Sequence, residues 1–301
     1  MLDVLSLQFV QHAVAAGLLA AVALGVVGTL VVVKREVFVS AGIAHASYGG
    51  VGLGFFLSLD PSLMAMVVGV ALAMAMGLVR RVSSQRTDTL IGAMWAIGMA
   101  SGVLLVDLTP GYTANARSFL FGSLLTVPTS DLVLIAVLDV VIVAIAVVGH
   151  RLLVAQAFDP VFVRARGLPS MVLDLLTLLL VALTVVVLMR VTGLVLLIAM
   201  LTLPAALAGR LTRTVGATMA LAGAVAALCT MAGLVVSYRA DVTSGPAVVG
   251  VTAAAYLLVV ATTAVVGRAY RRAGAAPAHA GAAPGGDPRR PHEHVGAASP
   301  G

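Results

Sequence analysis

Long apolar runs separated by short polar stretches dominate the chain, and nine of them are about as long as a membrane-spanning helix. A helix rises 1.5 Å per residue, so roughly 20 mostly apolar residues cross the ~30 Å hydrocarbon core of a bilayer. We predict an all-α, polytopic transmembrane bundle of about nine spans. Eight or ten spans are the alternatives, because the run that contains Pro204 is marginal in length and the short segment 116–127 is a candidate re-entrant or interfacial helix. The nine runs lie near residues 9–33, 37–57, 62–79, 89–106, 131–149, 171–189, 192–209, 215–236 and 246–266.

The composition agrees with this pattern. Of the 301 residues, 61% are hydrophobic and only 10% are charged, and the mean hydropathy is +1.12. A soluble domain carries about a quarter charged residues, so this chain has too few to cover a globule with polar surface. We therefore expect a lipid membrane, and no nucleic acid, around it.

The basic residues predict how the bundle is oriented. Lys and Arg accumulate in cytoplasmic loops. With the C-terminus in the cytoplasm, alternation of the spans places 15 of the 18 basic residues on the cytoplasmic side. The three that remain on the other side are Arg117, Arg190 and Arg239. The predicted orientation is therefore an N-terminus outside and a C-terminus inside.

The end of the sequence changes character. Residues 268–301 are rich in Ala, Gly, Pro and Arg and have almost no large apolar side chains. Such a segment buries too little surface to offset its ordering entropy. We predict a transmembrane domain at 1–267 and a disordered, basic cytoplasmic tail at 268–301.

The chain has a single lysine, Lys34, and no glycine-rich loop precedes it. A Walker A loop requires its lysine because that side chain reaches the nucleotide phosphates. We do not expect an enzyme here, and any ATP hydrolysis must come from another chain.

The predicted cytoplasmic loop at 150–170 contains a candidate short helix. Asp159 is placed as its N-cap, Pro160 occupies the favoured first position, and Gly167 ends it. The segment itself offers two uses, docking into a groove on a soluble partner or lying in the lipid headgroups. The residues that would form it are Phe158, Asp159, Pro160, Val161, Phe162, Arg164, Arg166 and Gly167.

Few ionisable side chains fall inside the predicted spans, and each is a candidate for function or for packing. His45 lies about halfway along the second span, and imidazole binds first-row divalent metals well. A histidine hydrogen-bonded to a neighbouring helix is the alternative. Ser40 and Ser47 are nearby oxygen donors, and Asp139 lies near the middle of the fifth span. These three are possible polar residues of a transport path.

Three ordered motifs resemble the permeases of bacterial zinc/manganese/iron ABC importers, over nearly the whole chain up to about residue 267. The stretch KREVFVSAGIAHASYGGVGLGFFL at 34–57 is similar to that family's R-R-x-x-F-x-x-D-A-x-S-H-A pattern followed by glycines. VTGLVLLIAMLTLPAALAGRLTRT at 191–214 is similar to its later Leu-Pro-Ala-Ala signature. DVTSGPAVV at 241–249 matches its Asp-x-x-Ser-Gly turn before the last span.

The resemblance implies a homodimeric permease in the bacterial cytoplasmic membrane, with cytoplasmic ATPase subunits and an extracytoplasmic metal-binding protein. It implies that Phe158 to Gly167 is the coupling helix, and that His45 is a metal ligand. The metal is then the transported substrate, with no permanently bound cofactor. One position departs from the pattern, because Ala41 stands where the family has an aspartate that shares a helix face with the histidine.

Import of Zn, Mn or Fe ions is therefore the leading functional hypothesis. A permease for a metal chelate or a cobalamin-type substrate is the alternative from the same class. An ion-gradient-driven secondary transporter is the third, and it predicts more mid-membrane carboxylates than the one clear example, Asp139.

Overall fold

The structure is a computed structural model that describes residues 8–82, 87–110, 118–122, 124 and 127–274. All the regular secondary structure of these residues is helical. The first apolar run forms one rod of three segments: α2 (Gln8–Ala23), the π-helical η1 (Leu24–Gly28) and α3 (Thr29–Lys34). The remaining helices are α4 (Val37–Phe56), α5 (Pro61–Val82), α6 (Thr87–Asp107), α8 (Thr129–Phe158), α9 (Pro160–Ala165), α10 (Ser170–Val191), α11 (Leu194–Leu211), α12 (Val215–Ala240) and α13 (Ser244–Gly274).

Eight helices among the described residues are long and apolar enough to cross a membrane, and they match eight of the nine predicted runs. The remaining predicted run, at 37–57, is α4, which forms a helix at the predicted place. It carries histidine, serine, tyrosine and five glycines among its 20 residues. The α-helical bundle is confirmed and the number of spans fits approximately. The predicted orientation of the termini stays a prediction.

The chain divides into two compact units, Met1–Val259 and Val260–Gly301, and α2 through α12 belong to the first. Helix α13 continues to Gly274, seven residues into the predicted tail. The rest of that tail lies outside the described residues. The domain boundary at 267 and the disorder of the tail remain predictions.

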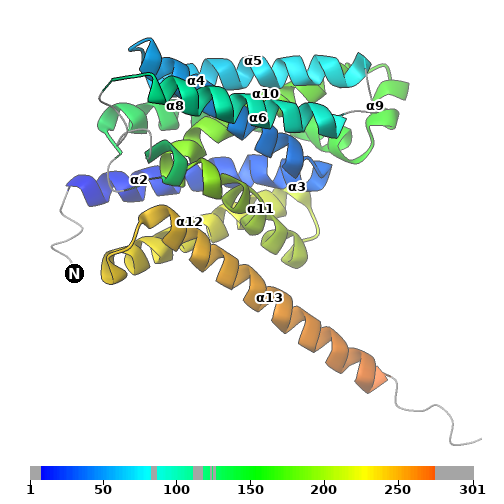
Figure 1. Cartoon of the computed structure of the whole chain (residues 1–301). Coiled ribbons are helices and arrows are strands. Elements are labelled where there is room, and N and C mark those ends of the chain that lie inside the picture. The colour runs from blue at the N-terminus through cyan, green and yellow to red at the C-terminus, as the bar shows by residue number, and fades with distance from the viewer. Residues whose placement is uncertain (1–7, 83–86, 111–117, 123, 125–126, 275–301) are drawn as a thin grey trace, which may run out of the picture. The chain divides into compact units, whose positions relative to one another are not determined.

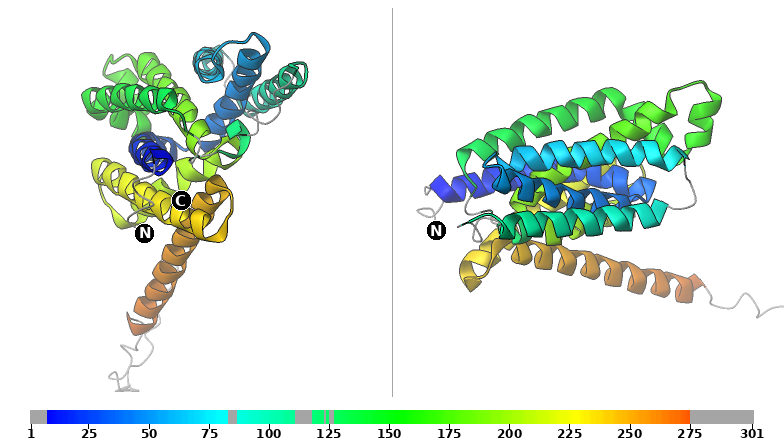
Figure 2. Two further views of the ribbon diagram at one scale, coloured as in Figure 1. Left: turned by 90° about the vertical axis from the view of Figure 1, so that its left-hand side faces the viewer. Right: turned by 45° about the horizontal axis from the view of Figure 1, so that its top comes forward.

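Helix α10 is the central element of the first unit. Its side chains are almost continuously buried from Thr177 to Val191, and α2, α4, α5, α8 and α11 all pack against it. Helix α4 packs against α5 on one side and α6 on the other, and α4 and α5 also contact α10 (Figures 1 and 2). The predicted site residue on α4 is therefore held inside a packed group of helices.

The predicted loop at 150–170 is mostly helical, which corrects the sequence interpretation. Helix α8 continues through residues 150–158 before it ends at Asp159. The segment HRLLVAQAF contains no helix breaker, so the helix persists until Asp159 and Pro160 interrupt it. At 1.5 Å per residue, the 30 residues of α8 are about 45 Å long. Because this exceeds the ~30 Å hydrocarbon core, one end of α8 extends beyond it.

Candidate functional site

His45 lies in the middle of α4 and its side chain is 8% exposed. Its Nδ1 lies 2.8 Å from the backbone carbonyl oxygen of Ala41, one turn earlier. A carbonyl oxygen only accepts hydrogen bonds, so Nδ1 carries the proton in this contact. In the neutral ring Nε2 then keeps its lone pair. Nε2 is therefore the atom that a metal ion would bind.

Trp95 of α6 covers one face of the His45 ring. The two ring centroids are 3.9 Å apart and the planes are inclined by 21°, so the rings are stacked. Phe38 adds a second, tilted aromatic contact to Trp95 at 6.2 Å. The sequence interpretation missed Trp95, although it is the only tryptophan of the chain. Its contact with His45 is tertiary, so no local pattern around position 95 indicates it.

The other predicted path residues do not gather around His45. Ser40 donates a hydrogen bond to the carbonyl oxygen of Glu36, and Ser47 donates one to that of Ile43, so both hydroxyls serve their own helix. Asp139 belongs to α8, which packs mainly against α2 and α10, whereas α4 packs mainly against α5 and α6. The described residues contain no group of three or more His, Cys, Asp or Glu side chains that could hold a metal ion.

Asp139 is a buried carboxylate of unusual isolation. Its side chain is 4% exposed, and neither oxygen has a hydrogen-bond partner among the described residues. A carboxyl group in this position is costly when ionised. The structure therefore places Asp139 in the bundle interior without bringing it to His45.

Glycines allow α4 to lie directly against its neighbours. A Cβ atom on Gly98 of α6 would overlap Ala46, and one on Gly102 would lie 2.6 Å from the carbonyl oxygen of Tyr48. A Cβ atom on Gly50 would lie 2.8 Å from Cα of Ala65 on α5. The Gly98-x-x-x-Gly102 motif thus packs helices within one chain, as small residues do in membranes. The same close contacts explain the glycine-rich run after His45.

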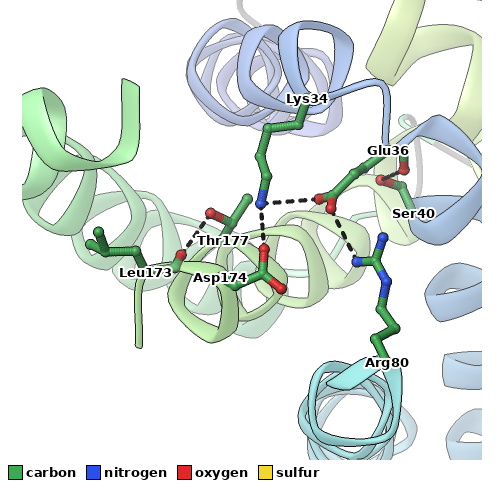
Figure 3. A network of polar contacts seen from close by, with 7 residues as sticks. All are labelled: Lys34, Glu36, Ser40, Arg80, Leu173, Asp174 and Thr177. Atoms are coloured by element: carbon green, nitrogen blue, oxygen red, sulfur yellow. Dashed lines mark hydrogen bonds and ion pairs between the residues drawn. The ribbon is translucent and has the colours of Figure 1, made fainter. Parts of the chain in front are cut away.

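A cluster of four charged side chains joins α3, α4, α5 and α10 at one end of the bundle (Figure 3). Lys34 Nζ lies 2.8 Å from Asp174 Oδ1 and 3.4 Å from Glu36 Oε2. Arg80 Nη1 lies 3.0 Å from Glu36 Oε1. Lys34 and Glu36 are each less than a tenth exposed, so little water screens this inner charge cluster.

The inner charge cluster fixes the turn that leads into α4. Arg35, between Lys34 and Glu36, adopts a left-handed conformation with φ 57° and caps α3. The sequence interpretation used Lys34 for orientation and to exclude a Walker A loop, and it gave Glu36 no role of its own. Its position two residues from Lys34 was a local signal, but the partners Arg80 and Asp174 come from distant segments.

The helix that was predicted between Phe158 and Gly167 is α9. The carboxylate of Asp159 accepts hydrogen bonds from the backbone N–H groups of Val161 and Phe162, at 3.0 and 2.8 Å. Gly167 has φ +72°, a conformation that favours glycine and ends the helix. Asp159 therefore caps this short helix, as its position in the sequence indicated.

The side chains of α9 divide into an inner and an outer face. Val163 is completely buried, which fixes α9 to the bundle. Phe158, the last residue of α8, is 67% exposed, and Val161 and Phe162 of α9 are 63% and 48% exposed. The guanidinium of Arg166 lies 5.0 Å from the centre of the Phe162 ring. The result is an exposed surface of apolar side chains beside an arginine.

A second polar cluster lies at the other end of α10. Arg190 Nε lies 3.0 Å from Asp131 Oδ2 at the start of α8 and donates a hydrogen bond of 2.7 Å to Ser62 of α5. Its guanidinium also lies 4.2 Å from the centre of the Phe119 ring. Ion pairs therefore hold α10 at both ends, and the sequence interpretation had only noted Arg190 as a basic residue on the outer side.

The Asp-x-x-Ser-Gly motif forms part of a close backbone junction at this same end. Ser244 Oγ accepts a hydrogen bond of 3.2 Å from the N–H of Leu124. A Cβ atom on Gly245 would overlap the carbonyl oxygen of Phe121. Gly193, with φ +79°, meets the same segment at Gly122. The motif thus packs the start of α13 against the segment before α8 and the start of α11.

Comparisons with known proteins place these features in a wider group. The model of the ABC 3 transport family matches residues 6–263 of the chain. An uncharacterized membrane protein of Synechocystis sp. is 43% identical over 258 residues, which cover 86% of this chain and 92% of that protein. The manganese transport system membrane protein MntC of Halalkalibacterium halodurans is 29% identical, over 85% of this chain and 88% of that protein.

A solved structure has the same arrangement of helices. PsaBC from Streptococcus pneumoniae, determined in complex with Fab, superposes with a TM-score of 0.79 at 26% sequence identity. The superposition covers 86% of this chain and 93% of the matched chain. The likeness therefore extends over almost the complete helical bundle.

Proposed function

We propose, from the premise that the chain belongs to the ABC 3 transport family, that it is the membrane-spanning permease of an ABC importer for divalent transition-metal ions. The match to MntC, a manganese transport system membrane protein, supports a metal ion as the cargo. The observation within the chain that carries the proposal is His45, which is buried and whose Nε2 makes no hydrogen bond to any residue that the structure describes. The ion would be Zn, Mn or Fe, bound as substrate and not as a resident cofactor.

The few metal-binding donors around His45 are the reason to propose a second copy of the chain. One imidazole nitrogen is a weak site for a metal ion, which takes four to six donors from protein and water. Ala41 offers no carboxylate beside it, and the methyl group leaves only the backbone carbonyl that orients the ring. A homodimer would supply His45 twice. Weak binding also suits transport, because the ion must leave the site again.

The energy for transport would come from a separate cytoplasmic ATPase that docks on α9. The exposed Val161 and Phe162 would enter an apolar groove of that partner, with Arg166 at the rim. An extracytoplasmic metal-binding protein would deliver the ion to the opposite face. Both faces belong to a bundle in the cytoplasmic membrane of a bacterium.

The inner charge cluster provides a physical link between α9 and His45. Helix α9 is followed by α10, whose first turns carry Asp174. Asp174 pairs with Lys34, which also pairs with Glu36 directly before α4. A displacement of α9 by the ATPase would therefore reach the start of the helix that holds His45, through charges that are poorly screened.

Asp139 favours a second candidate, transport driven by an ion gradient. Its buried carboxylate has no hydrogen-bond partner among the described residues, and such groups carry protons or cations in secondary transporters. This candidate needs no nucleotide and makes Asp139 essential. The two candidates therefore predict opposite requirements for the same assay.

Uptake into liposomes tests the proposal. The chain is reconstituted with and without its ATPase, and ⁵⁴Mn²⁺ or ⁶⁵Zn²⁺ is measured with ATP or with an imposed pH gradient. We expect uptake only with the ATPase and ATP, a strong decrease in His45→Ala, and nearly normal uptake in Asp139→Asn. Nucleotide-free, gradient-driven uptake that Asp139→Asn abolishes would instead establish the second candidate. Normal uptake by His45→Ala would remove His45 from the path.

A further inference from the structure

A groove of 650 Å³ opens on the side of the first unit, where η1 forms the floor between α8 and α12. The left view of Figure 2 shows the first helix between these two neighbours. Most of the lining is apolar, and two side chains at one end are basic, His150 and Arg151. The apolar residues of the lining are Val26, Val143, Ala146, Val147, Val148, Leu152 and Met219.

The basic end of the groove lies at the depth of lipid headgroups. Helix α8 begins at Thr129, and Asp131 in its first turn pairs with Arg190. About 20 residues of helix cross the ~30 Å hydrocarbon core, so a helix that enters near 129 leaves it near 149. His150 and Arg151 come directly after that position. Val143 and Ala146 lie one to two turns earlier, at the depth of the upper acyl chains.

The charges of the groove are suited to an anion. Arg151 is exposed and makes no ion pair with any residue that the structure describes. No Asp or Glu lines the groove. A guanidinium binds a phosphate by two parallel hydrogen bonds, and a neighbouring imidazole is a further donor.

We infer that this groove, formed by η1, α8 and α12, is a binding site for one anionic phospholipid. Its acyl chains lie along Val143, Ala146 and Val147, and its phosphate contacts Arg151 with His150 beside it. Basic pockets between transmembrane helices recognise such headgroups. Apolar side chains as exposed as Val147 and Val148, at 70% and 90%, then face lipid in the membrane. The site does not depend on the cargo or on the ATPase.

Native mass spectrometry of the full-length chain in mild detergent tests this site. The protein is titrated with phosphatidylglycerol and with phosphatidylcholine that has the same acyl chains. We expect preferential retention of phosphatidylglycerol and about a five-fold loss of it in Arg151→Gln, the factor expected for one basic side chain at an anionic headgroup. Val147→Trp fills the groove without entering the core, so it should reduce retention of the same lipid while the protein stays folded.

The matched control is Arg164→Gln, which removes an exposed arginine of α9 outside the groove. It should retain phosphatidylglycerol as the wild type does. Equal retention of the two lipids would mean that the groove does not select an anionic headgroup, and an equal loss in Arg164→Gln would mean that only diffuse charge is at work. Either result would overturn the inference. A disulfide between two copies of Val148→Cys in membranes would assign the groove to a second copy of the chain and would overturn it as well.

Discussion

The indole ring of Trp95 is stacked on the imidazole ring of His45, with 3.9 Å between the centroids. The contact joins α6 to α4 at the point where α4 carries its only histidine. Together with the hydrogen bond from Nδ1 to the carbonyl oxygen of Ala41, it fixes the orientation of the ring, and Nε2 has no hydrogen-bond partner in the described part of the chain. Trp95 would thus act as a positioning residue for the proposed ligand.

We predict that Trp95→Leu lowers metal uptake by about three- to tenfold, because an aromatic pair contributes roughly 0.5–1.5 kcal/mol beyond the area it buries. Trp95→Phe should retain most of the activity, since a smaller ring can still stack. The measurements are initial uptake rate against metal concentration and the yield of assembled complex. If the two substitutions reduce uptake equally while the complex stays intact, stacking on His45 is not what Trp95 supplies.

The proposed docking role of α9 predicts that Phe162→Asp abolishes co-purification with the ATPase. Phe162 is 48% exposed, so a carboxylate there disturbs the partner contact without entering the core. Tyr238→Asp is the matched control, because Tyr238 is an aromatic side chain that is 63% exposed on a different helix. The complex should survive that control. A stable complex with Phe162→Asp would place the docking contact elsewhere.

The sequence predicted the helices well because the membrane imposes a simple rule. Apolar length located the eight helices that are apolar and long enough to span a membrane, and Asp159, Pro160 and Gly167 located the short helix α9, which runs from Pro160 to Ala165. The site was only partly predictable. His45 is visible as a histidine inside an apolar run, but Trp95 and Asp174 reach their partners only after distant helices have packed. The distance between Asp139 and His45 also depends on how the helices pack, so the sequence did not show that the two side chains lie apart.

The inner charge cluster predicts strong coupling between Lys34 and Asp174. Lys34→Met leaves the Asp174 carboxylate, which is 31% exposed, without its partner, so it should lower the free energy of unfolding by about 1–3 kcal/mol. The double variant Lys34→Met/Asp174→Asn should lose less stability than the sum of the two single losses, by roughly 0.5–3 kcal/mol. Thermal unfolding in detergent measures all four proteins.

The control for this cycle is Arg213→Gln, an exposed basic residue at the turn between α11 and α12. Its effect on the free energy of unfolding should be within about 0.5 kcal/mol.

The same variants also test whether a movement of α9 is transmitted to α4. If the inner charge cluster links α9 to α4, Lys34→Met protein that remains assembled should hydrolyse ATP with less metal moved per nucleotide. Additive stabilities and unchanged coupling of hydrolysis to transport would make the cluster an ordinary set of surface pairs.

Two glycines on α6 offer a sharp test of how α4 is held. A Cβ atom on Gly98 would overlap Ala46, whereas one on Gly92 would meet nothing within 4 Å. Gly98→Ala should therefore separate the two helices and destabilise the protein by about 1–3 kcal/mol, the usual cost of an overpacked contact. Gly92→Ala, in the same helix, should leave stability unchanged or raise it by up to about 1 kcal/mol, because alanine favours the helix. The carbonyl oxygen of His45 lies 2.9 Å from the Cβ position of residue 98, so Gly98→Ala should also lower metal uptake. Equal stability of the two variants would mean that α4 and α6 do not depend on this close approach.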